Sequence, residues 1–281
     1  MEDIKNCRIQ YANEIKYVSN IQSESIIDAF AKVPRENFLG PGPWEILDVF
    51  ARKYWSTKDN DPRHLYHNIL VAIDKERSLN NGQPSLWALL FDKLMLKEGE
   101  KIIHIGCGTG YYSAILSEIV GDSGHVTAIE IDGSISDLAE QNLSYKSNIK
   151  VIRTNGVEYF EENTDVIVVN AGVSRISARW LESLVLGGCL LLPLTSSEGL
   201  GWFVKITKLN KGYLANAICQ TKIFHCEGGR DADADLLVEE AFKKEHIRCI
   251  KSLRLEPHDA HESCYLHGNN YCFSKLEIQT S

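Results

Sequence analysis

The sequence has 281 residues, of which 44% are hydrophobic and 24% are charged, proportions that exclude a disordered or fibrous chain. Its 30 lysines and arginines are outnumbered by 38 aspartates and glutamates, and the formal net charge of -8 argues against a nucleic-acid partner. Eight scattered cysteines, no long apolar run and no secretion signal at the start predict a cytoplasmic protein with reduced thiols and no membrane partner.

Residues 1–82 are expected to form a helical and loop-rich cover. Apolar residues at helical spacing predict helix within residues 1–39, with Ser25 in a capping position and Pro34 at the end of the run. Clustered prolines, glycines and asparagines predict irregular structure for residues 40–82. Tryptophans and tyrosines among these turns indicate that the cover packs on a larger body.

Residues 83–208 show a regular alternation of apolar helices and short apolar strands. The predicted helices cover residues 84–95, 111–120, 133–143 and 177–186. The predicted strands cover residues 101–106, 125–131, 149–153, 165–170 and 189–194. This alternation predicts an α/β fold with a Rossmann-like, doubly wound and mostly parallel sheet, covered by helices on both faces.

Residues 209–281 are expected to form an α+β extension, because the alternation stops near residue 200. Antiparallel strands are predicted at 201–208 and 214–224, a helix at 231–244 and a last strand near 271–278.

Histidines and cysteines accumulate in this extension: they are His225, Cys226, His258, His261, Cys264, His267 and Cys272. Zinc binds such side chains, but the paired C-x2-C spacing of structural zinc sites is absent. Buried thiols and surface histidines are the simpler interpretation, so no metal is expected. The stretch from Cys264 to Cys272 equally fits a hairpin with a Gly-Asn-Asn turn, whose cysteines face the core.

The strongest functional motif is Gly-Cys-Gly-Thr-Gly at residues 106–110, between a predicted strand and a predicted helix. Alternate glycines allow a tight turn and bring backbone N–H groups close to a ligand at the start of the helix. Glu130 ends the next predicted strand, where a carboxylate can accept hydrogen bonds from both hydroxyls of a ribose. A tight strand–helix connection without a ligand is the alternative, but it leaves Glu130 unexplained.

The identity of the nucleoside follows from the glycine spacing. Dinucleotide sites carry G-x-G-x-x-G, whereas here Tyr111 replaces the third glycine, which argues against an NAD-dependent oxidoreductase. The compact loop and acidic strand end resemble the S-adenosylmethionine site of class I methyltransferases. This resemblance implies that Glu130 holds the ribose, while Asp132 is better explained as a helix cap. It also implies that the amino-acid part of the cofactor is held by Gly106, Cys107, Gly108, Thr109 and Gly110.

Two asparagines at predicted strand ends are further cofactor-binding candidates. Asn155, followed by Gly156, stands where related enzymes place a side chain against the adenine amino group. Asn170 ends the strand at 165–170, at the carboxyl edge where doubly wound sheets bind ligands. A simple turn is the alternative at both positions.

Several segments, in the same order and spacing, resemble the protein-L-isoaspartate O-methyltransferase family over about residues 25–205. They are A-F-A-K-V-P-R-E-N-F-L (29–39), N-G-Q-P (81–84), H-I-G-C-G-T-G-Y-Y-S-A-I-L-S (104–117), D-V-I-V-V-N-A-G (165–172) and L-V-L-G-G-C-L-L-L-P-L (184–194). The resemblance implies a cytoplasmic repair enzyme for peptides or proteins. Such enzymes transfer a methyl group from S-adenosylmethionine to the α-carboxylate of an L-isoaspartyl residue.

The expected substrate loop departs from that family. A hydroxyl residue usually precedes its Gln-Pro pair, whereas here Gly82 takes that place and Asn80 stands where a threonine is typical. Asn81 and Gln83 remain candidates to donate hydrogen bonds to an acceptor carboxylate, although a loop that only covers the cofactor fits equally well. Such a carboxylate is ionised near pH 7 and needs no base. A different methyl acceptor and an inactive binding module with this fold therefore stay open.

Overall fold

The computed structural model describes residues 2–278, and the chain divides into two compact units. One unit consists of Met1–Glu100 and Cys107–Arg153, and the other of Lys101–Gly106 and Thr154–Ser281. The chain thus passes from one unit to the other within the glycine loop. The domain limits expected from the sequence, after residues 82 and 208, stay a prediction.

Three helices of the first unit pack on one another: they are α1 (Glu2–Ser19), α2 (Glu24–Lys32) and α3 (Pro84–Leu94). The rings of Tyr11 and Phe30 join α1 to α2 in an edge-to-face contact at 6.2 Å. The predicted capping role of Ser25 is wrong, because Glu24 is already helical and the capping position is Ser23. The helix ends before Pro34, as predicted.

A small antiparallel sheet corrects the expectation of irregular structure for residues 40–82. Its strands, in the order β2-β1-β3-β4, are β1 (Glu45–Asp48), β2 (Lys53–Ser56), β3 (Leu70–Asp74) and β4 (Leu79–Asn80). Trp44, Ile46 and Val71 are buried in a cluster of their own beneath it. Strands of two to five residues leave most of the segment in turns, which is why the sequence pattern hides them.

The rest of the first unit follows the prediction closely. It consists of α4 (Tyr111–Val120), β6 (His125–Glu130), α5 (Gly133–Leu143) and β7 (Ile149–Arg153). The strands β6 and β7 are parallel neighbours. Asp132 caps α5, as expected, because its carboxylate accepts hydrogen bonds from the backbone N–H groups of Ser134 and Ile135 at 3.0 and 3.2 Å.

The second unit contains an extended sheet whose neighbouring strands run in the order β13-β14-β12-β11-β10-β9-β8-β5. Their bounds are β5 (Lys101–Ile105), β8 (Thr164–Val169), β9 (Leu184–Thr195), β10 (Leu200–Leu209), β11 (Gly212–Lys222), β12 (Ser252–Arg254), β13 (Cys264–His267) and β14 (Cys272–Ser274). The pairs β5–β8 and β8–β9 are parallel, and the pairs beyond β9 are antiparallel.

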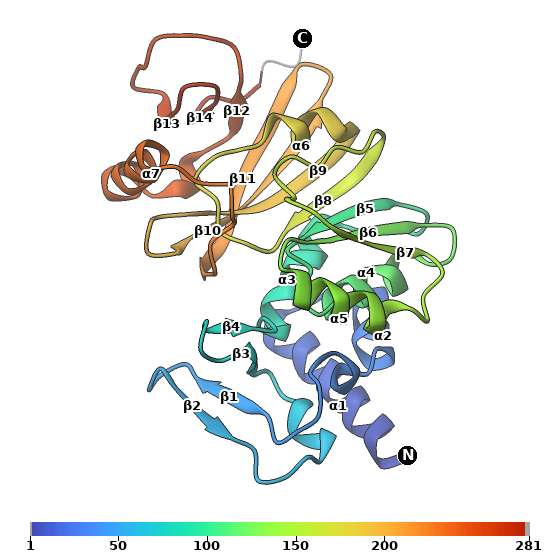
Figure 1. Ribbon diagram of the computed structural model, residues 1–281. Coiled ribbons are helices and arrows are strands. Elements are labelled where there is room, and N and C mark those ends of the chain that lie inside the picture. Colours follow the sequence, from blue (N-terminus) through green and yellow to red (C-terminus); the bar gives the residue numbers. More distant parts are fainter. Residues whose placement is uncertain (1, 279–281) are drawn as a thin grey trace. The chain divides into compact units, whose positions relative to one another are not determined.

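Two helices belong to this unit, α6 (Ala178–Ser183) and α7 (Ala232–Lys244), and α7 lies beside β13 (Figure 1). The predicted helix at 177–186 is too long, because the backbone of β9 is already extended at Leu184. The predicted last strand near 271–278 is limited to Cys272–Ser274, which pairs with β13 as the alternative hairpin.

The predicted α/β fold is therefore confirmed, including its parallel strands, its antiparallel C-terminal part and its connecting helices. Within residues 2–278, every helix is too short or too polar to cross a lipid bilayer. The carboxyl ends of β5 and β6 lead into the loop and the carboxylate that the sequence singles out.

Candidate functional site

The glycine loop adopts a backbone that requires its glycines. Gly106, Gly108 and Gly110 have φ angles of +73°, +57° and +96°, in the left-handed region that side chains disfavour. At Gly110 a Cβ would also lie only 2.7 Å from Leu143 Cδ1. Because α4 begins directly after Gly110, the N–H groups of its first turn have no intrahelical acceptor and are available to a ligand at the loop.

Glu130 is attached to this loop by its side chain. Its Oε2 accepts a hydrogen bond from the N–H of Gly108 at 2.9 Å. Its Oε1 accepts two more, from Ile131 at 2.9 Å and Asp132 at 3.1 Å. A carboxylate offers about four acceptor positions, so one remains on Oε2. The structure thus brings Glu130 to the loop, but in this arrangement it offers a ribose one acceptor position rather than the two expected.

The two remaining loop residues differ in chemistry. The Oγ1 of Thr109 is buried and has no hydrogen-bond partner within residues 2–278, so a bound group would satisfy it. Burial and the neighbouring charge of Glu130 hold the pKa of the Cys107 thiol well above its usual value. Cys107 therefore stays protonated at neutral pH and is a poor nucleophile. The loop offers a hydroxyl, backbone groups and one carboxylate position, a set that suits the polar parts of S-adenosylmethionine.

Tyr111 confirms why a dinucleotide is a poor fit. Its ring is 1% exposed and lies 5.6 Å from the ring of Phe38, and its hydroxyl lies 3.3 Å from that of Tyr11. The residue that replaces the third glycine is thus a core aromatic side chain, where a dinucleotide loop needs the close backbone approach of a glycine.

The candidate acceptor loop is anchored by Arg35, a residue of the V-P-R-E-N-F segment that is not among the predicted site residues. Arg35 is fully buried, and its Nε donates a hydrogen bond to Oδ1 of Asn81 at 3.2 Å. Its other nitrogens donate to the carbonyl oxygens of Leu65, His67 and Ile69, at 3.0, 3.2 and 2.9 Å. The sequence carries no signal for this role, because Arg35 follows the helix that ends before Pro34 and its partners are distant along the chain.

The same contact orients Asn81. Because Oδ1 faces Arg35, the amide nitrogen of Asn81 carries the donors that remain for an acceptor. Gln83 is half-buried and forms the N-cap of α3 without a side-chain capping bond. Asn81 and Gln83 flank Gly82 in the sequence, and their roles toward an acceptor stay a prediction.

Gly82 is fitted to its surroundings in a way that excludes the usual hydroxyl residue. Its φ angle is +79°, and a Cβ would lie 2.7 Å from Nε1 of Trp87 and 3.1 Å from the ring of Tyr112. The hydroxyl of Tyr112 donates a hydrogen bond to the carbonyl oxygen of Gly82 at 3.1 Å. A serine fits here only if the indole of Trp87 moves. The side chains around the loop therefore favour glycine at this position.

The second unit contains the other cofactor-binding candidates. Oδ1 of Asn155 accepts a hydrogen bond from the N–H of Val157 at 3.0 Å, so the turn role is observed. The carbonyl oxygen of Gly156 accepts a hydrogen bond from Nε1 of Trp180 at 2.8 Å. Asn170 follows β8 and donates its backbone N–H to the carbonyl oxygen of Ile105 at 2.8 Å. Cofactor contacts of these residues stay predictions.

Comparison with known proteins supplies independent evidence. A sequence model of the protein-L-isoaspartate(D-aspartate) O-methyltransferase family matches residues 10–230. A protein-L-isoaspartate O-methyltransferase of Thermotoga maritima is 30% identical over 178 residues, which are 61% of this chain and 51% of that protein. Another, of Ignicoccus hospitalis, is 27% identical over 199 residues, which are 69% of this chain and 84% of that protein. The match thus spans about half of the Thermotoga protein.

Solved structures agree with these sequence matches. One described as a protein-L-isoaspartate O-methyltransferase has a TM-score of 0.65 at 25% identity and covers 84% of this chain and 69% of its own. Another, from Plasmodium falciparum and in complex with S-adenosyl-L-homocysteine, has a TM-score of 0.62 at 17% identity. It covers 78% of this chain and 97% of its own and supports the fold.

Proposed function

Because the chain belongs to the protein-L-isoaspartate(D-aspartate) O-methyltransferase family, we propose that it transfers a methyl group from S-adenosylmethionine to a carboxylate of a peptide or protein. The α-carboxylate of an L-isoaspartyl residue is the first acceptor to test, as the names of the relatives indicate. The observation that carries the proposal is the hydrogen bond between Glu130 and the N–H of Gly108, which joins the two parts of the expected cofactor site.

Different residues near the glycine loop suit different parts of S-adenosylmethionine. S-adenosylmethionine, when bound, supplies an electrophilic methyl group. The backbone N–H groups at the start of α4 and the hydroxyl of Thr109 suit its polar amino-acid part. The free acceptor position on Oε2 of Glu130 suits a ribose hydroxyl. Gly106, Asn155, Gly156 and Asn170 remain candidates in the second unit.

The acceptor side needs orientation more than proton transfer. A carboxylate is already ionised near pH 7, so methylation requires no general base. What the protein must provide is alignment and exclusion of water. The amide nitrogen of Asn81, fixed by the bond from Arg35 to its Oδ1, is a donor for that carboxylate. Gly82 offers no hydroxyl, so donors to the acceptor come from amides.

The direct test is transfer of labelled methyl from S-adenosylmethionine to a peptide that contains one L-isoaspartyl residue. The matched control is the same peptide with ordinary aspartate. Label in the first peptide alone supports the proposal. Label only in other components of a cell lysate indicates a different acceptor. Calorimetric binding of S-adenosylmethionine without any transfer indicates an inactive module, and absence of binding rejects the cofactor assignment.

Replacing Glu130 with glutamine tests the cofactor side. The amide keeps one oxygen but presents an N–H₂ group where Oε2 accepts from Gly108 and offers its free position. Loss of one charge-assisted hydrogen bond, about 1.5–3 kcal/mol, predicts roughly 10- to 100-fold weaker binding of S-adenosylmethionine. Isothermal titration calorimetry measures it.

Asp132 provides the matched control for that experiment. It is the next carboxylate along the chain, and Asp132→Asn keeps an oxygen that caps α5. We expect the affinity of Asp132→Asn for S-adenosylmethionine to stay within about twofold of the native value, since Oδ1 caps α5 and Oδ2 pairs with Arg77. Equal affinity of Glu130→Gln and the native protein would contradict the ribose assignment.

We also propose a cytoplasmic location and a partner limited to the methyl acceptor. All eight cysteines are free thiols, which suits a reducing compartment. The net charge of -8 gives no general attraction for nucleic acid. Fractionation of the cells that make the protein, followed by detection with an antibody, tests the location.

A further inference from the structure

The C-terminal extension brings four metal-binding side chains together: they are His258, Cys264, His267 and Cys272. One ligand atom from each of them lies within 4.8 Å of the ligand atoms of the other three. The family match ends at residue 230, so the cluster lies in a part of the chain that the family does not describe. We propose that it is a structural zinc site made of two imidazoles and two thiolates.

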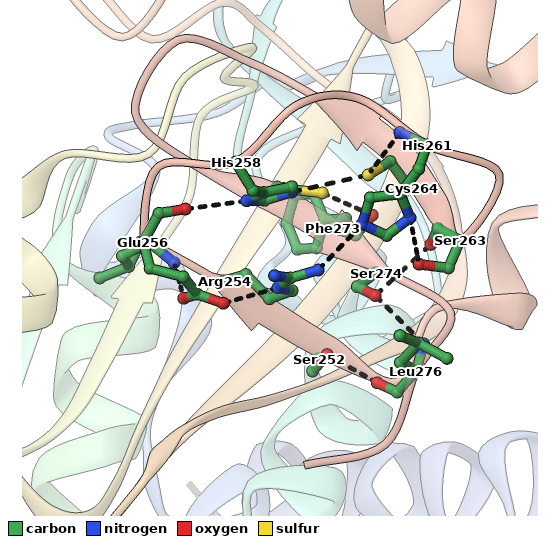
Figure 2. Close-up of polar contacts among 12 residues, drawn as sticks. Ser252, Arg254, Glu256, His258, His261, Ser263, Cys264, Phe273, Ser274 and Leu276 are labelled. Carbon is green, nitrogen blue, oxygen red and sulfur yellow. Dashed lines mark hydrogen bonds and ion pairs between the residues drawn. The ribbon is translucent and has the colours of Figure 1, made fainter.

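One pair of ligand atoms already has the spacing of a tetrahedral zinc site. Zinc binds sulfur at about 2.3 Å and imidazole nitrogen at about 2.0–2.1 Å, so tetrahedral ligand atoms lie roughly 3.3–3.8 Å apart. Nε2 of His258 and Sγ of Cys264 are 3.6 Å apart, and Figure 2 shows them pointing toward one another. The rings of His258 and His267 meet edge to face with centroids 4.8 Å apart, so both imidazoles converge on one place.

His258 is held in the tautomer that metal binding requires. Its Nδ1 lies 2.8 Å from the carbonyl oxygen of Glu256, and since a carbonyl can only accept, Nδ1 carries the proton (Figure 2). Nε2 therefore keeps its lone pair for a metal. A histidine ligand whose other N–H donates to a carbonyl is the usual arrangement around zinc.

The sulfur of Cys264 is also positioned to bind a metal ion. Its sulfur accepts a hydrogen bond from the backbone N–H of His261 at 3.5 Å, in addition to its contact with His258. A donor of this kind stabilises the thiolate form, which is the form that binds zinc. Both ring nitrogens of His261 have other partners, because Nδ1 lies 2.8 Å from Oγ of Ser263 and Nε2 lies 3.3 Å from Nη1 of Arg254.

The other two ligands come from facing positions of one hairpin. His267 on β13 is directly opposite Cys272 on β14 in the strand register. Nδ1 of His267 is buried and has no hydrogen-bond partner within residues 2–278, and a buried polar atom left in this way lowers stability. Cys272 is 1% exposed. A zinc ion would give the buried imidazole of His267 a partner, which the simpler interpretation of buried thiols does not. The sulfur of Cys272, which lies 3.6 Å from the carbonyl oxygen of Phe273, would exchange that weak contact for the ion.

The donor set identifies the ion and its role. Thiolates and imidazoles select zinc over the magnesium and calcium that prefer oxygen. Four protein ligands leave no position for a substrate or water, so the site is structural. Binding displaces the two thiol protons, and the two thiolates then balance the charge of the ion.

The ion would attach an irregular segment to the hairpin. His258 lies in residues 255–263, which have no helix or strand, whereas the other three ligands lie on β13 and β14. Tyr271, which directly precedes the ligand Cys272, donates a hydrogen bond from its hydroxyl to the carbonyl oxygen of Ser174 at 2.6 Å. Tyr271 also lines a cavity of about 1090 Å³, with residues of α6 and α7. Zinc would therefore fix the hairpin next to this cavity residue.

The test is the metal content of the full chain, purified with a reductant and without chelator. We expect about one zinc ion per chain. Loaded with Co²⁺, the protein is expected to show the visible absorption of tetrahedral thiolate coordination. His258→Ala and Cys272→Ser are each expected to weaken Zn²⁺ binding at least about 100-fold, in competition with a chromophoric chelator.

A check of folding and a matched control variant accompany this test. Cys272 is buried, so its replacement can disturb folding; His258 lies on the irregular segment, and folding of His258→Ala is checked by circular dichroism. The matched control is His261→Ala, which keeps the backbone N–H to Cys264 and is expected to retain the metal. Native protein that neither contains zinc nor binds added Zn²⁺ would overturn the proposal. So would an intact mass that reveals a disulfide between Cys264 and Cys272.

Discussion

Replacing Arg35 with alanine is expected to lower the free energy of unfolding by about 3–5 kcal/mol. The side chain is fully buried, and its nitrogens bind the carbonyl oxygens of Leu65, His67 and Ile69 together with Asn81. Removal takes the donor away from Oδ1 of Asn81 and from the carbonyl oxygens of Leu65 and Ile69, whereas the carbonyl oxygen of His67 keeps a hydrogen bond from the N–H of Ile69 at 2.9 Å. Arg35→Lys keeps the charge, but a single ammonium group cannot reach all four oxygens, so we expect it to recover only part of the loss.

Urea unfolding, followed by tryptophan fluorescence, measures this loss. The control is Lys32→Ala in the same segment: Lys32 is 71% exposed and pairs with Glu118 on the surface, so its loss is expected to change stability by less than about 1 kcal/mol. If Arg35→Ala is as stable as Lys32→Ala, the hydrogen bonds of Arg35 do not anchor the loop that contains Asn81. The methyl-transfer rate provides a second readout, because Asn81 loses its fixed orientation.

Most helices and strands predicted between residues 83 and 208 are confirmed, because buried parallel strands appear in sequence as short apolar runs between amphipathic helices. One error has a local cause. The pattern predicts helix at the start of β9 because Gly187 and Gly188 interrupt the apolar run of the strand. The pattern does not indicate the sheet β1–β4 for a different reason: its buried residues, such as Trp44 and Val71, lie far apart in sequence and meet only in the fold.

In the candidate site, too, some contacts are predictable from the sequence and others are not. Contact between Glu130 and the glycine loop was predictable, because both follow the ends of strands and the motif has a fixed spacing. The role of Arg35 was not, because its partner Asn81 is 46 positions away and its other acceptors are backbone carbonyls, which any residue provides. The zinc ligands lacked a recognisable spacing, since pairing of β13 with β14 sets His267 against Cys272.

The stability of the protein is expected to fall steeply on acidification because of His104. This residue lies in β5, is completely buried, and has a pKa of about 3 because burial disfavours its charged form. An unfolded histidine has a pKa near 6.5, so between these values the unfolded chain binds a proton that the folded chain does not. Stability is therefore lost as the pH falls below about 6.5, by about 2 kcal/mol at pH 5 and about 3 kcal/mol at pH 4.

His104→Leu removes this proton uptake and keeps the position apolar, so its free energy of unfolding should depend less on pH. Urea unfolding of both proteins at pH 7, 5 and 4 isolates the effect. Other groups that titrate in acid contribute equally to both: Asp132, whose pKa is about 2 because Ser134 and Arg77 bind its carboxylate, is one of them. The difference between the two curves should grow to about 3 kcal/mol at pH 4. Parallel curves would mean that His104 accepts a proton inside the folded core, and that burial of β5 is less complete than its contacts indicate.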